Sequence, residues 1–340
     1  MIIETVLPWH DSLWEKMQHR WQADRLPHAL LLVGPKGMGK ALFAKRLADA
    51  LLCEQPNATK KQACGLCKSC HVQLAKTHPD FLEVQPVEPG KQISIEKIRN
   101  LIHFCELTAH YGRYQIIIIN PAEAMNRNAA NSLLKLLEEP PPKTLIMLVS
   151  HQHNTLSATI RSRCQRIDFS RPDRQLIQTW LSRQLKNSTI QQIQLLLNLS
   201  GQAPLAALAL AETDAMTKRQ ALFNSLIQLP EGKHDPIRVA EQWDKLEAIP
   251  VLHWMLSWTM DIIRYTITGQ TQYIVNQDHQ KTIQHFANQV DLHSLFKLLE
   301  LQQEAIRLVT GNANVKAQSL LESIAIFWIE LTTQNRRRLL

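Results

Sequence analysis

Two uninterrupted apolar runs, joined by one helical pattern, constrain the fold of this chain more than any other feature of its sequence. The first run covers residues 116–119 and the second covers residues 144–149. Between them, residues 129–139 carry leucines at helical spacing and end at three consecutive prolines. Such runs, connected by a crossover helix, are typical of parallel strands that are buried on both faces. The sequence therefore predicts an α/β fold built on a parallel sheet.

Length and composition exclude several classes of protein. With 340 residues, the chain has room for two or three domains, and its 45% hydrophobic and 20% charged residues are ordinary for a globular protein. No apolar run approaches the roughly 20 residues that a membrane helix needs, and residues 1–5 lack a signal-peptide pattern. We therefore expect a cytoplasmic protein without a membrane partner, whose cysteines are metal ligands or free thiols. The net charge of +8 indicates a nucleic-acid partner only weakly.

A phosphate-binding loop is predicted between a strand at residues 29–33 and a helix at residues 41–52. Its three glycines and one lysine are Gly34, Gly37, Gly39 and Lys40. Glycines let backbone N–H groups face phosphate, the helix N-terminus adds positive potential, and the lysine contacts the β- and γ-phosphates. The Ser or Thr that would bind Mg²⁺ is replaced by Ala41, which offers no ligand. Phosphate binding and a relic turn that binds nothing therefore both stay open, and productive Mg·ATP binding is disfavoured.

Four of the six cysteines predict a structural zinc site. These cysteines are Cys53, Cys64, Cys67 and Cys70. The C-x2-C turns let neighbouring thiolates converge, and four thiolates match the tetrahedral preference of structural zinc. The alternative is a set of unrelated buried thiols. Cys105 and Cys164 stand apart from the cluster, and we expect them to be buried packing residues.

Two motifs resemble the shared signatures of the AAA+ clamp-loader family: L-L-K-L-L-E-E-P-P at residues 133–141 and S-R-C at residues 162–164. The resemblance implies an AAA+ domain with a RecA-like parallel sheet of the P-loop type. It also implies a zinc insertion, a helical lid and an all-α C-terminal oligomerisation (collar) domain. The expected boundaries are residues 1–170, with the zinc module at about 53–70, then 171–212 and 213–340.

The resemblance also implies that the machinery for ATP hydrolysis is incomplete. Family ATPases end the first apolar run in Asp-Glu, which hold Mg²⁺ and polarise the attacking water, and carry a second sensor arginine further along. The replacements in this chain are Ala41, Asn120, Pro121 and, near the second sensor, Ala203 and Pro204. Ser150 keeps a polar group at the position of the first sensor. Glu123 could substitute for the lost carboxylates only if the loop were reshaped.

Arg163, in the S-R-C motif, is implied by the resemblance to be an arginine finger. Such a finger reaches the nucleotide of a neighbouring subunit, where its planar fork binds phosphate oxygens in pairs. From the residues alone, an ordinary solvated arginine at the end of a strand is the alternative. Arg161 is the rival for the finger role.

Taken with these replacements, the resemblance implies a non-hydrolysing stator subunit of a bacterial DNA polymerase III clamp loader. Such a subunit supports ATP-dependent loading of the sliding clamp onto primed DNA, within a DNA-directed DNA polymerase (nucleotidyltransferase) holoenzyme. The implied partners are gamma/tau motor subunits and a delta subunit in a hetero-oligomer, the sliding clamp and primer–template DNA. The implied cofactor is structural Zn²⁺.

Two other classes of protein stay open. One is an active clamp-loader ATPase of the gamma/tau type, in which Glu123 rescues the site. The other is a zinc-stapled nucleic-acid-binding module, which the scattered basic residues and the lack of an aromatic and basic face disfavour. The basic tail at residues 336–338 is expected to be solvated, with DNA contact as the alternative.

Overall fold

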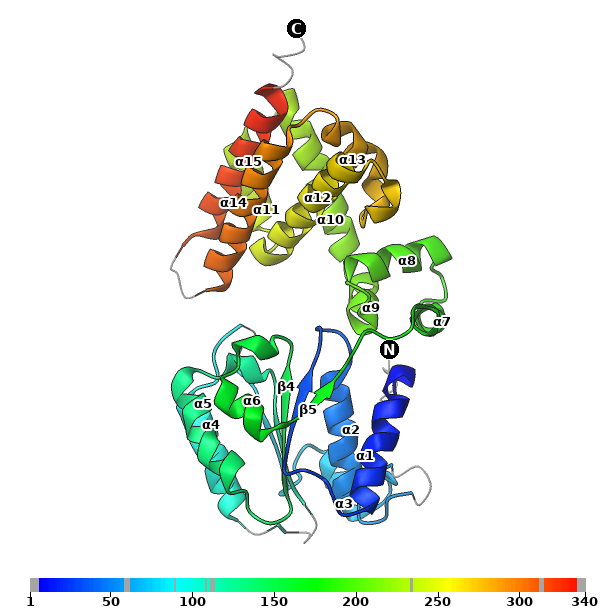
Figure 1. Ribbon diagram of the computed structural model, residues 1–340, viewed down its shortest axis with the longest axis vertical. Helices are drawn as coiled ribbons and strands as arrows, with labels where there is room; N and C mark the ends of the chain where they lie inside the picture. Colours follow the sequence, from blue (N-terminus) through cyan, green and yellow to red (C-terminus); the bar gives the residue numbers. More distant parts are fainter. Residues whose placement is uncertain are drawn as a thin grey trace. The chain divides into compact units, whose positions relative to one another are not determined.

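The computed structural model describes residues 6–57, 62–88, 90–107, 109–110, 114–232, 235–311 and 315–334. The chain divides into two compact units (Figure 1). The first consists of Met1–Thr179 with Ala203–Ala206, and the second of Trp180–Gln202 with Ala207–Leu340. The finer division into three domains stays a prediction. The basic tail at residues 336–338 lies outside the described residues.

The first unit is built on a five-stranded sheet with the order β2-β3-β4-β1-β5, and every neighbouring pair is parallel. The strands are β1 Ala29–Val33, β2 Phe81–Val84, β3 Gln115–Ile119, β4 Thr144–Ser150 and β5 Gln165–Asp168. The three central strands β1, β3 and β4 are buried along their whole length. This burial explains the uninterrupted apolar runs, and it confirms the predicted parallel α/β sheet.

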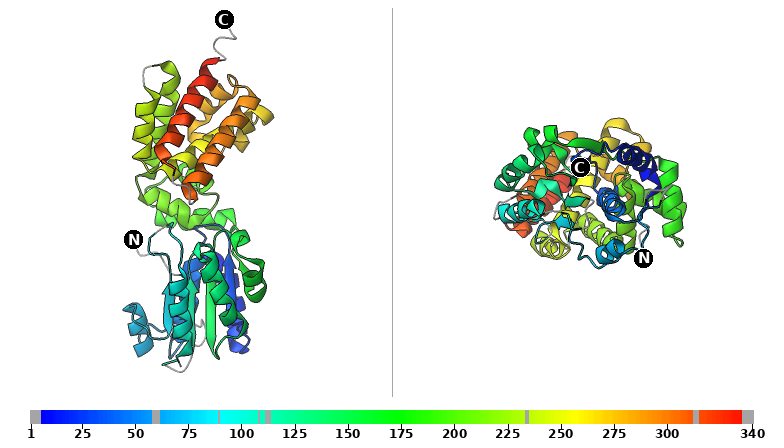
Figure 2. Two further views of the ribbon diagram at one scale, coloured as in Figure 1. Left: turned by 90° about the vertical axis from the view of Figure 1, so that its left-hand side faces the viewer. Right: turned by 90° about the horizontal axis from the view of Figure 1, so that it is seen from below.

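Helices cover both faces of this sheet, and Figure 2 shows the first unit from two further sides. The helices that lie wholly in this unit are η1 Pro8–His10, α1 Asp11–Gln22, α2 Lys40–Leu52, α3 Lys68–Leu74, α4 Ile95–Glu106, η2 Ala122–Ala124, α5 Arg127–Glu138, η3 His153–Thr155 and α6 Ala158–Arg163. On one face, Trp14 and Met17 of α1 pack with α2 against the sheet. On the other face, α4, α5 and α6 share a second core. The predicted crossover helix is therefore α5, between β3 and β4.

The second unit is entirely helical among its described residues, as predicted for the C-terminal region. Together with α7 Arg174–Gln184 and α9 Pro204–Glu212, which cross the boundary between the units, its helices are α8 Ile190–Leu199, α10 Ala215–Gln228, η4 Leu229–Glu231, α11 Pro236–Asp244, α12 Ala248–Thr268, η5 Thr271–Tyr273, η6 Gln277–His279, α13 Gln280–Ala287, α14 Leu292–Thr310 and α15 Ala317–Gln334. Trp243, Trp258 and Trp328 are buried in one core with Leu321 and Ile324. The apolar side chains of α15 thus contribute to the core of their own unit.

A buried polar network joins three segments of the second unit. Arg219 of α10 is only 1% exposed, forms an ion pair with Asp278, and donates a 2.7 Å hydrogen bond to Oδ1 of Asn276. Asn276 in turn donates to the buried carboxylate of Asp261 at 2.7 Å. A buried charge is tolerated when it is paired and hydrogen-bonded, so this network ties α10 and α12 to the segment before α13.

Across the described ranges, no single helix is long and apolar enough to cross a membrane. One bent pair, Ile190–Leu199 with Pro204–Glu212, meets the length and composition criteria only when the two helices are taken together.

Candidate functional site

The loop between β1 and α2 has the glycine-dependent backbone of a phosphate-binding loop. Gly37 and Gly39 have φ angles of 85° and 84°, in the left-handed region that favours glycine. A Cβ atom at Gly39 would lie 2.4 Å from Cδ1 of Leu7, and one at Gly37 would lie 2.7 Å from Cβ of Ala206. The loop therefore needs glycine both for its turns and because other segments pack directly against it.

Lys40 is turned back onto its own loop. Its side chain is buried, and its ammonium group donates hydrogen bonds of 2.6 Å to the carbonyl oxygens of Gly34 and Pro35. Burial lowers the pKa of Lys40 to about 8, and the nearby carboxylate of Glu123 opposes that shift. The structure thus brings together the predicted loop residues, with the lysine engaged by the loop itself.

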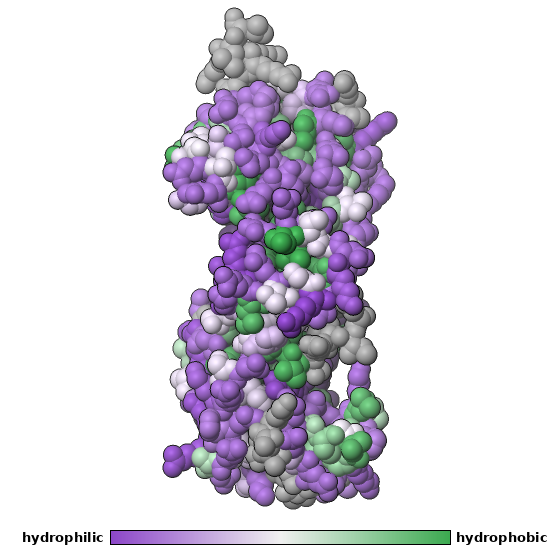
Figure 3. Space-filling view, turned by 90° about the vertical axis from the view of Figure 1, so that its right-hand side faces the viewer, coloured by the Kyte–Doolittle hydropathy of each residue, from purple (hydrophilic) through white to green (hydrophobic). Residues whose placement is uncertain are grey.

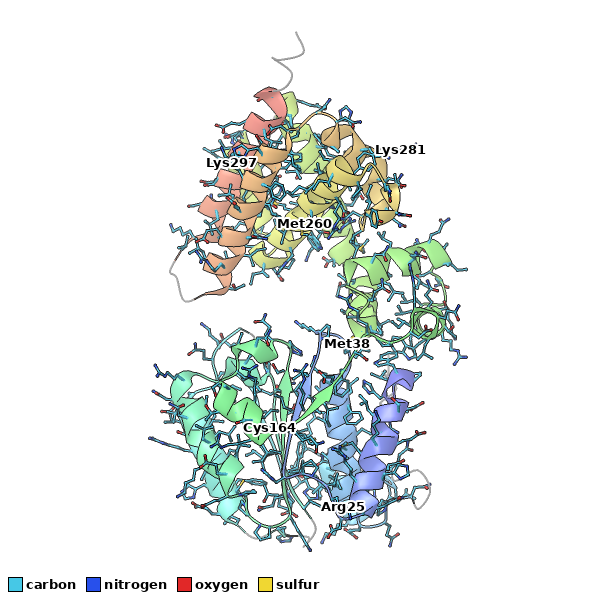
Figure 4. The ribbon with its side chains drawn as sticks, viewed as in Figure 1. Arg25, Met38, Cys164, Met260, Lys281 and Lys297 are labelled. Carbon is cyan, nitrogen blue, oxygen red and sulfur yellow. The ribbon has the colours of Figure 1, made fainter. Side chains whose placement is uncertain are left out.

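Two further segments bond to the carbonyl groups of the loop. Met38, labelled in Figure 4, accepts hydrogen bonds on its carbonyl oxygen from Nε1 of Trp9 at 3.0 Å and from Nε2 of His10 at 2.9 Å. The backbone N–H of Leu205 donates to the carbonyl of Gly37 at 3.0 Å. Leu205 directly follows Ala203-Pro204, where the resemblance implies a lost sensor arginine. Sequence reasoning missed these partners because they show no motif or periodicity.

The predicted catalytic positions gather at the carboxyl edge of the sheet. Asn120 directly follows β3, and Ser150 ends β4 opposite Val33 at the end of β1. The hydroxyl of Ser150 is buried and has no hydrogen-bond partner among the described residues. Since Asn120 and Pro121 have no carboxylate, neither can hold a metal ion in the way that an acidic pair does.

Glu123 is held beside the missing acidic pair. Its Oε1 accepts a 2.8 Å hydrogen bond from the backbone N–H of His151, which fixes the carboxylate against the end of β4. His151 is a neighbour that sequence reasoning missed. Burial and the positive charge of Lys40 lower the pKa of His151, so the imidazole tends to be neutral beside the loop.

The four predicted cysteine ligands converge. Their sulfur atoms all lie within 4.8 Å of one another, and the Cys53–Cys67 and Cys64–Cys70 pairs are each 3.9 Å apart. Zinc–sulfur bonds of about 2.3 Å in a tetrahedron place sulfur atoms about 3.8 Å apart. The donor set and its spacing therefore fit a tetrahedral metal ion, and the cluster can bind a metal.

Backbone N–H groups and one buried hydroxyl hold the cysteines in place. The N–H of Cys64 points at the sulfur of Cys53 at 3.3 Å, and that of Cys70 points at the sulfur of Cys67 at 3.4 Å. Ser69, inside the cluster, is buried and donates to the carbonyl of Leu52 at 2.7 Å. By contrast, Cys105 and Cys164 are buried in the core beside α4 and α5, which confirms their predicted packing role.

The segment that carries the four cysteines, together with the rest of α3, is called the cysteine module here, and it carries an exposed apolar patch. Figure 3 shows hydrophobic side chains gathered over the part of the first unit that contains α3. Leu66 and Leu74 are 81% and 84% exposed. These two leucines therefore lie outside any apolar core of the described residues.

Arg163 is the last residue of the short helix α6, and only Cys164 separates it from the strand β5. Ser157 caps this helix by accepting a 3.3 Å hydrogen bond from the N–H of Ile160. Arg163 is half-buried and its Nη2 lies 2.5 Å from Oε1 of Glu138, whereas Arg161 is exposed. The guanidinium of Arg163 therefore has a fixed partner at the surface.

These features define the class of the protein: an α/β fold of the P-loop type on a parallel sheet, with a glycine loop and a helical C-terminal region. Two family models match the sequence. The model described as DNA polymerase III, delta subunit matches residues 9–173. A second model, which describes the C-terminal part of the DNA polymerase III delta subunit, matches residues 213–330.

Relatives then identify the family. DNA polymerase III subunit delta' of Pseudomonas aeruginosa is 33% identical over 326 residues, which cover 96% of this chain and 98% of the relative. The Escherichia coli subunit delta' is 34% identical over 76% of each chain. The chain belongs to the DNA polymerase III subunit delta' family of clamp-loader components. A solved gamma subunit-related protein from Thermotoga maritima aligns with 93% of this chain and 99% of its own, with a TM-score of 0.43 and 14% identity.

Proposed function

We propose that this chain is a non-hydrolysing subunit of a bacterial DNA polymerase III clamp loader that donates Arg163 to the ATP site of a neighbouring subunit. In this role, it supports ATP-dependent loading of the sliding clamp onto primer–template DNA. Its partners are motor subunits of the gamma/tau type and a delta subunit. One observation carries the proposal: the chain lacks the groups that hydrolyse its own ATP, yet keeps the arginine that would act on another.

The missing groups are those on which phosphoryl transfer depends most. Catalysis of this reaction consists of positioning a metal ion and a water molecule and of stabilising charge. Ala41 and Asn120 remove two metal-binding groups, and Pro121 removes the carboxylate that polarises water. The hydrogen bonds that hold Lys40 on its loop and Glu123 on His151 support the same conclusion. The second of these bonds counts against rescue of an active site by Glu123.

Arg163 suits a role in trans for chemical reasons. A guanidinium stays charged at all relevant pH values and binds phosphate oxygens through a planar fork. Arginine fingers are worth about 10³–10⁵ in rate at the site they serve. The exposed part of the side chain supports contact with a neighbouring subunit.

The test is to rebuild clamp-loader complexes with Arg163→Ala, Arg163→Lys and Arg161→Ala variants. Arg163→Ala should assemble normally but sharply reduce DNA-dependent ATP hydrolysis and clamp loading. Lysine should rescue poorly because a point charge cannot reproduce the fork. Arg161→Ala should have the smaller effect. Wild-type loading by fully assembled Arg163→Ala complexes would refute the finger role.

We also propose that the ion held by the cysteine cluster is zinc and that its role is structural. Four thiolates saturate a tetrahedral ion, so no position is left for water or substrate. The ion would join the end of α2 to the start of α3, and no catalytic step is assigned to it.

A further inference from the structure

The finger candidate Arg163 is anchored by two groups of its own chain. Its Nη2 pairs with Oε1 of Glu138 at 2.5 Å, and its Nη1 donates to the carbonyl of Thr159 at 3.0 Å. The side chains of Arg163 and Glu138 are 32% and 49% exposed. An ion pair this exposed contributes little to folding stability, so stability alone does not account for its presence.

Core packing fixes the positions of Glu138 and Arg163. Glu138 ends α5 directly after the buried Leu137, and Arg163 ends α6. Leu133 and Leu137 of α5 share one core with Ile160 of α6. Because the two helix ends are held by this core, the ion pair forms without any neighbouring subunit.

We propose that Glu138 is a positioning residue for Arg163, an inference that rests on the proposed finger role. A guanidinium has five N–H donors, and two of the five are engaged by Glu138 and Thr159. The remaining donors have no acceptor in the part of the chain that the structure describes, so they can contact a phosphate. Glu138 therefore holds the fork in one orientation before the neighbouring nucleotide arrives. Orienting a reacting group in advance matters because a misplacement of about 1 Å can cost about 10²-fold in rate.

Glu139 provides a matched control. It is the next residue in the chain, carries the same charge and is exposed. No ion pair of Glu139 is found within the described part of the chain. If the loss of a negative surface charge were enough to lower ATP hydrolysis, Glu139→Gln would lower it as much as Glu138→Gln. If Glu138 instead positions the finger, Glu139→Gln should leave ATP hydrolysis unchanged.

The experiment uses complete complexes rebuilt with Glu138→Ala, Glu138→Gln, Glu139→Gln, Arg163→Ala and the Glu138→Ala/Arg163→Ala pair, each checked for assembly by gel filtration. Glu138→Ala should lower kcat for clamp- and DNA-stimulated ATP hydrolysis by about tenfold and leave KM for ATP unchanged. Glu138→Gln, whose amide oxygen still accepts a hydrogen bond, should lose less. Glu139→Gln should match wild type. Once Arg163 is alanine, the change at Glu138 should have no further effect, because the two residues act together.

Three results would overturn the inference, and they differ in whether the proposed function is also refuted. If Arg163→Ala is impaired while Glu138→Ala equals wild type, Glu138 does not position the finger and the proposed function stands. If the loss from Glu138→Ala persists in the Arg163→Ala background, Glu138 acts through the structure of α5 instead. If Arg163→Ala itself loads clamps at the wild-type rate, the proposed function and this inference both fail.

Discussion

Among single residues, His10 shows most clearly how burial sets charge beside the glycine loop. Its ring is buried, and a carbonyl oxygen can only accept, so Nε2 must carry the proton that binds Met38. The other ring nitrogen, Nδ1, has no hydrogen-bond partner among the described residues. Protonation would place an unpaired N–H in the core near Arg46. Burial therefore lowers the pKa of His10 to about 4.

This shift predicts a loss of stability in mild acid. Since the unfolded chain has a histidine pKa of 6.5 and the folded pKa is about 4, only the unfolded state takes up the proton between these values. The contribution of neutral His10, on the order of 3 kcal/mol at most, is therefore present above pH 6.5 and is lost as the pH falls towards 4. Urea unfolding at pH 7 and pH 5 should show a smaller decrease in the free energy of unfolding for His10→Gln than for wild type.

The control for His10 is His103→Gln, which changes an exposed imidazole. This variant should follow the wild-type pH dependence. An equal loss of stability in wild type and His10→Gln would show that His10 is not the group that titrates.

At the level of elements, the cysteine module depends on more than its own sequence. The helix α3 has 7 residues, and its only buried residue is Ser69. Isolated helices shorter than about 12 residues are marginal in water. The two ends of the module must therefore be joined by something other than apolar packing. A metal ion that links Cys53, directly after α2, to Cys67, which caps α3, and to Cys70 within α3 meets this need.

We predict one zinc ion per chain, lost in Cys67→Ala. Removing one of four thiolates should weaken metal binding strongly and loosen the module, while the sheet stays folded. Elemental analysis of protein prepared without chelator measures the zinc, and limited proteolysis between α2 and β2 measures the loosening. Cys105→Ala should retain its zinc because Cys105 packs in a separate core. Wild-type protein without zinc would contradict the prediction.

At the level of the whole molecule, the chain combines a parallel sheet and a glycine loop with a site from which the metal- and water-binding side chains implied by the resemblance are absent. The sheet edge, the glycine loop and Lys40 are present, but Ala41, Asn120 and Pro121 stand where the metal and water would be held. The proposed activity therefore exists only in an assembly, where Arg163 can meet the nucleotide of another subunit.

We predict no ATP turnover by the isolated chain. Loss of the metal- and water-orienting groups should cost several orders of magnitude, roughly the 8 kcal/mol or more that enzymes supply. The measurement is steady-state hydrolysis by protein followed through successive purification steps. Pro121→Glu should not restore activity, because Ala41 and Asn120 remain. Hydrolysis that stays proportional to this protein through purification would refute the prediction.

Much of the fold could be predicted because it depends on local patterns. β1 occupies the predicted residues 29–33, and α2 begins at Lys40, one residue before the predicted start. The helix α6 was missed because a helix of 6 residues is too short to show a helical period. The S-R-C motif nevertheless identifies Arg163 as the candidate finger, although the motif does not predict the helix that carries it.

The sequence by itself determined the parallel sheet and the cysteine cluster. Uninterrupted apolar runs joined by a crossover helix are typical of parallel strands buried between two layers of helices, and closely spaced thiolates can meet on one ion whatever surrounds them. The tertiary structure alone decided that Lys40 bonds to its own loop, that His10 and Leu205 bond to that loop, and that Glu138 pairs with Arg163. Apart from the bonds of Lys40, these contacts join residues far apart in the chain. They leave no period or spacing in the sequence, because they arise only when the core brings the segments together.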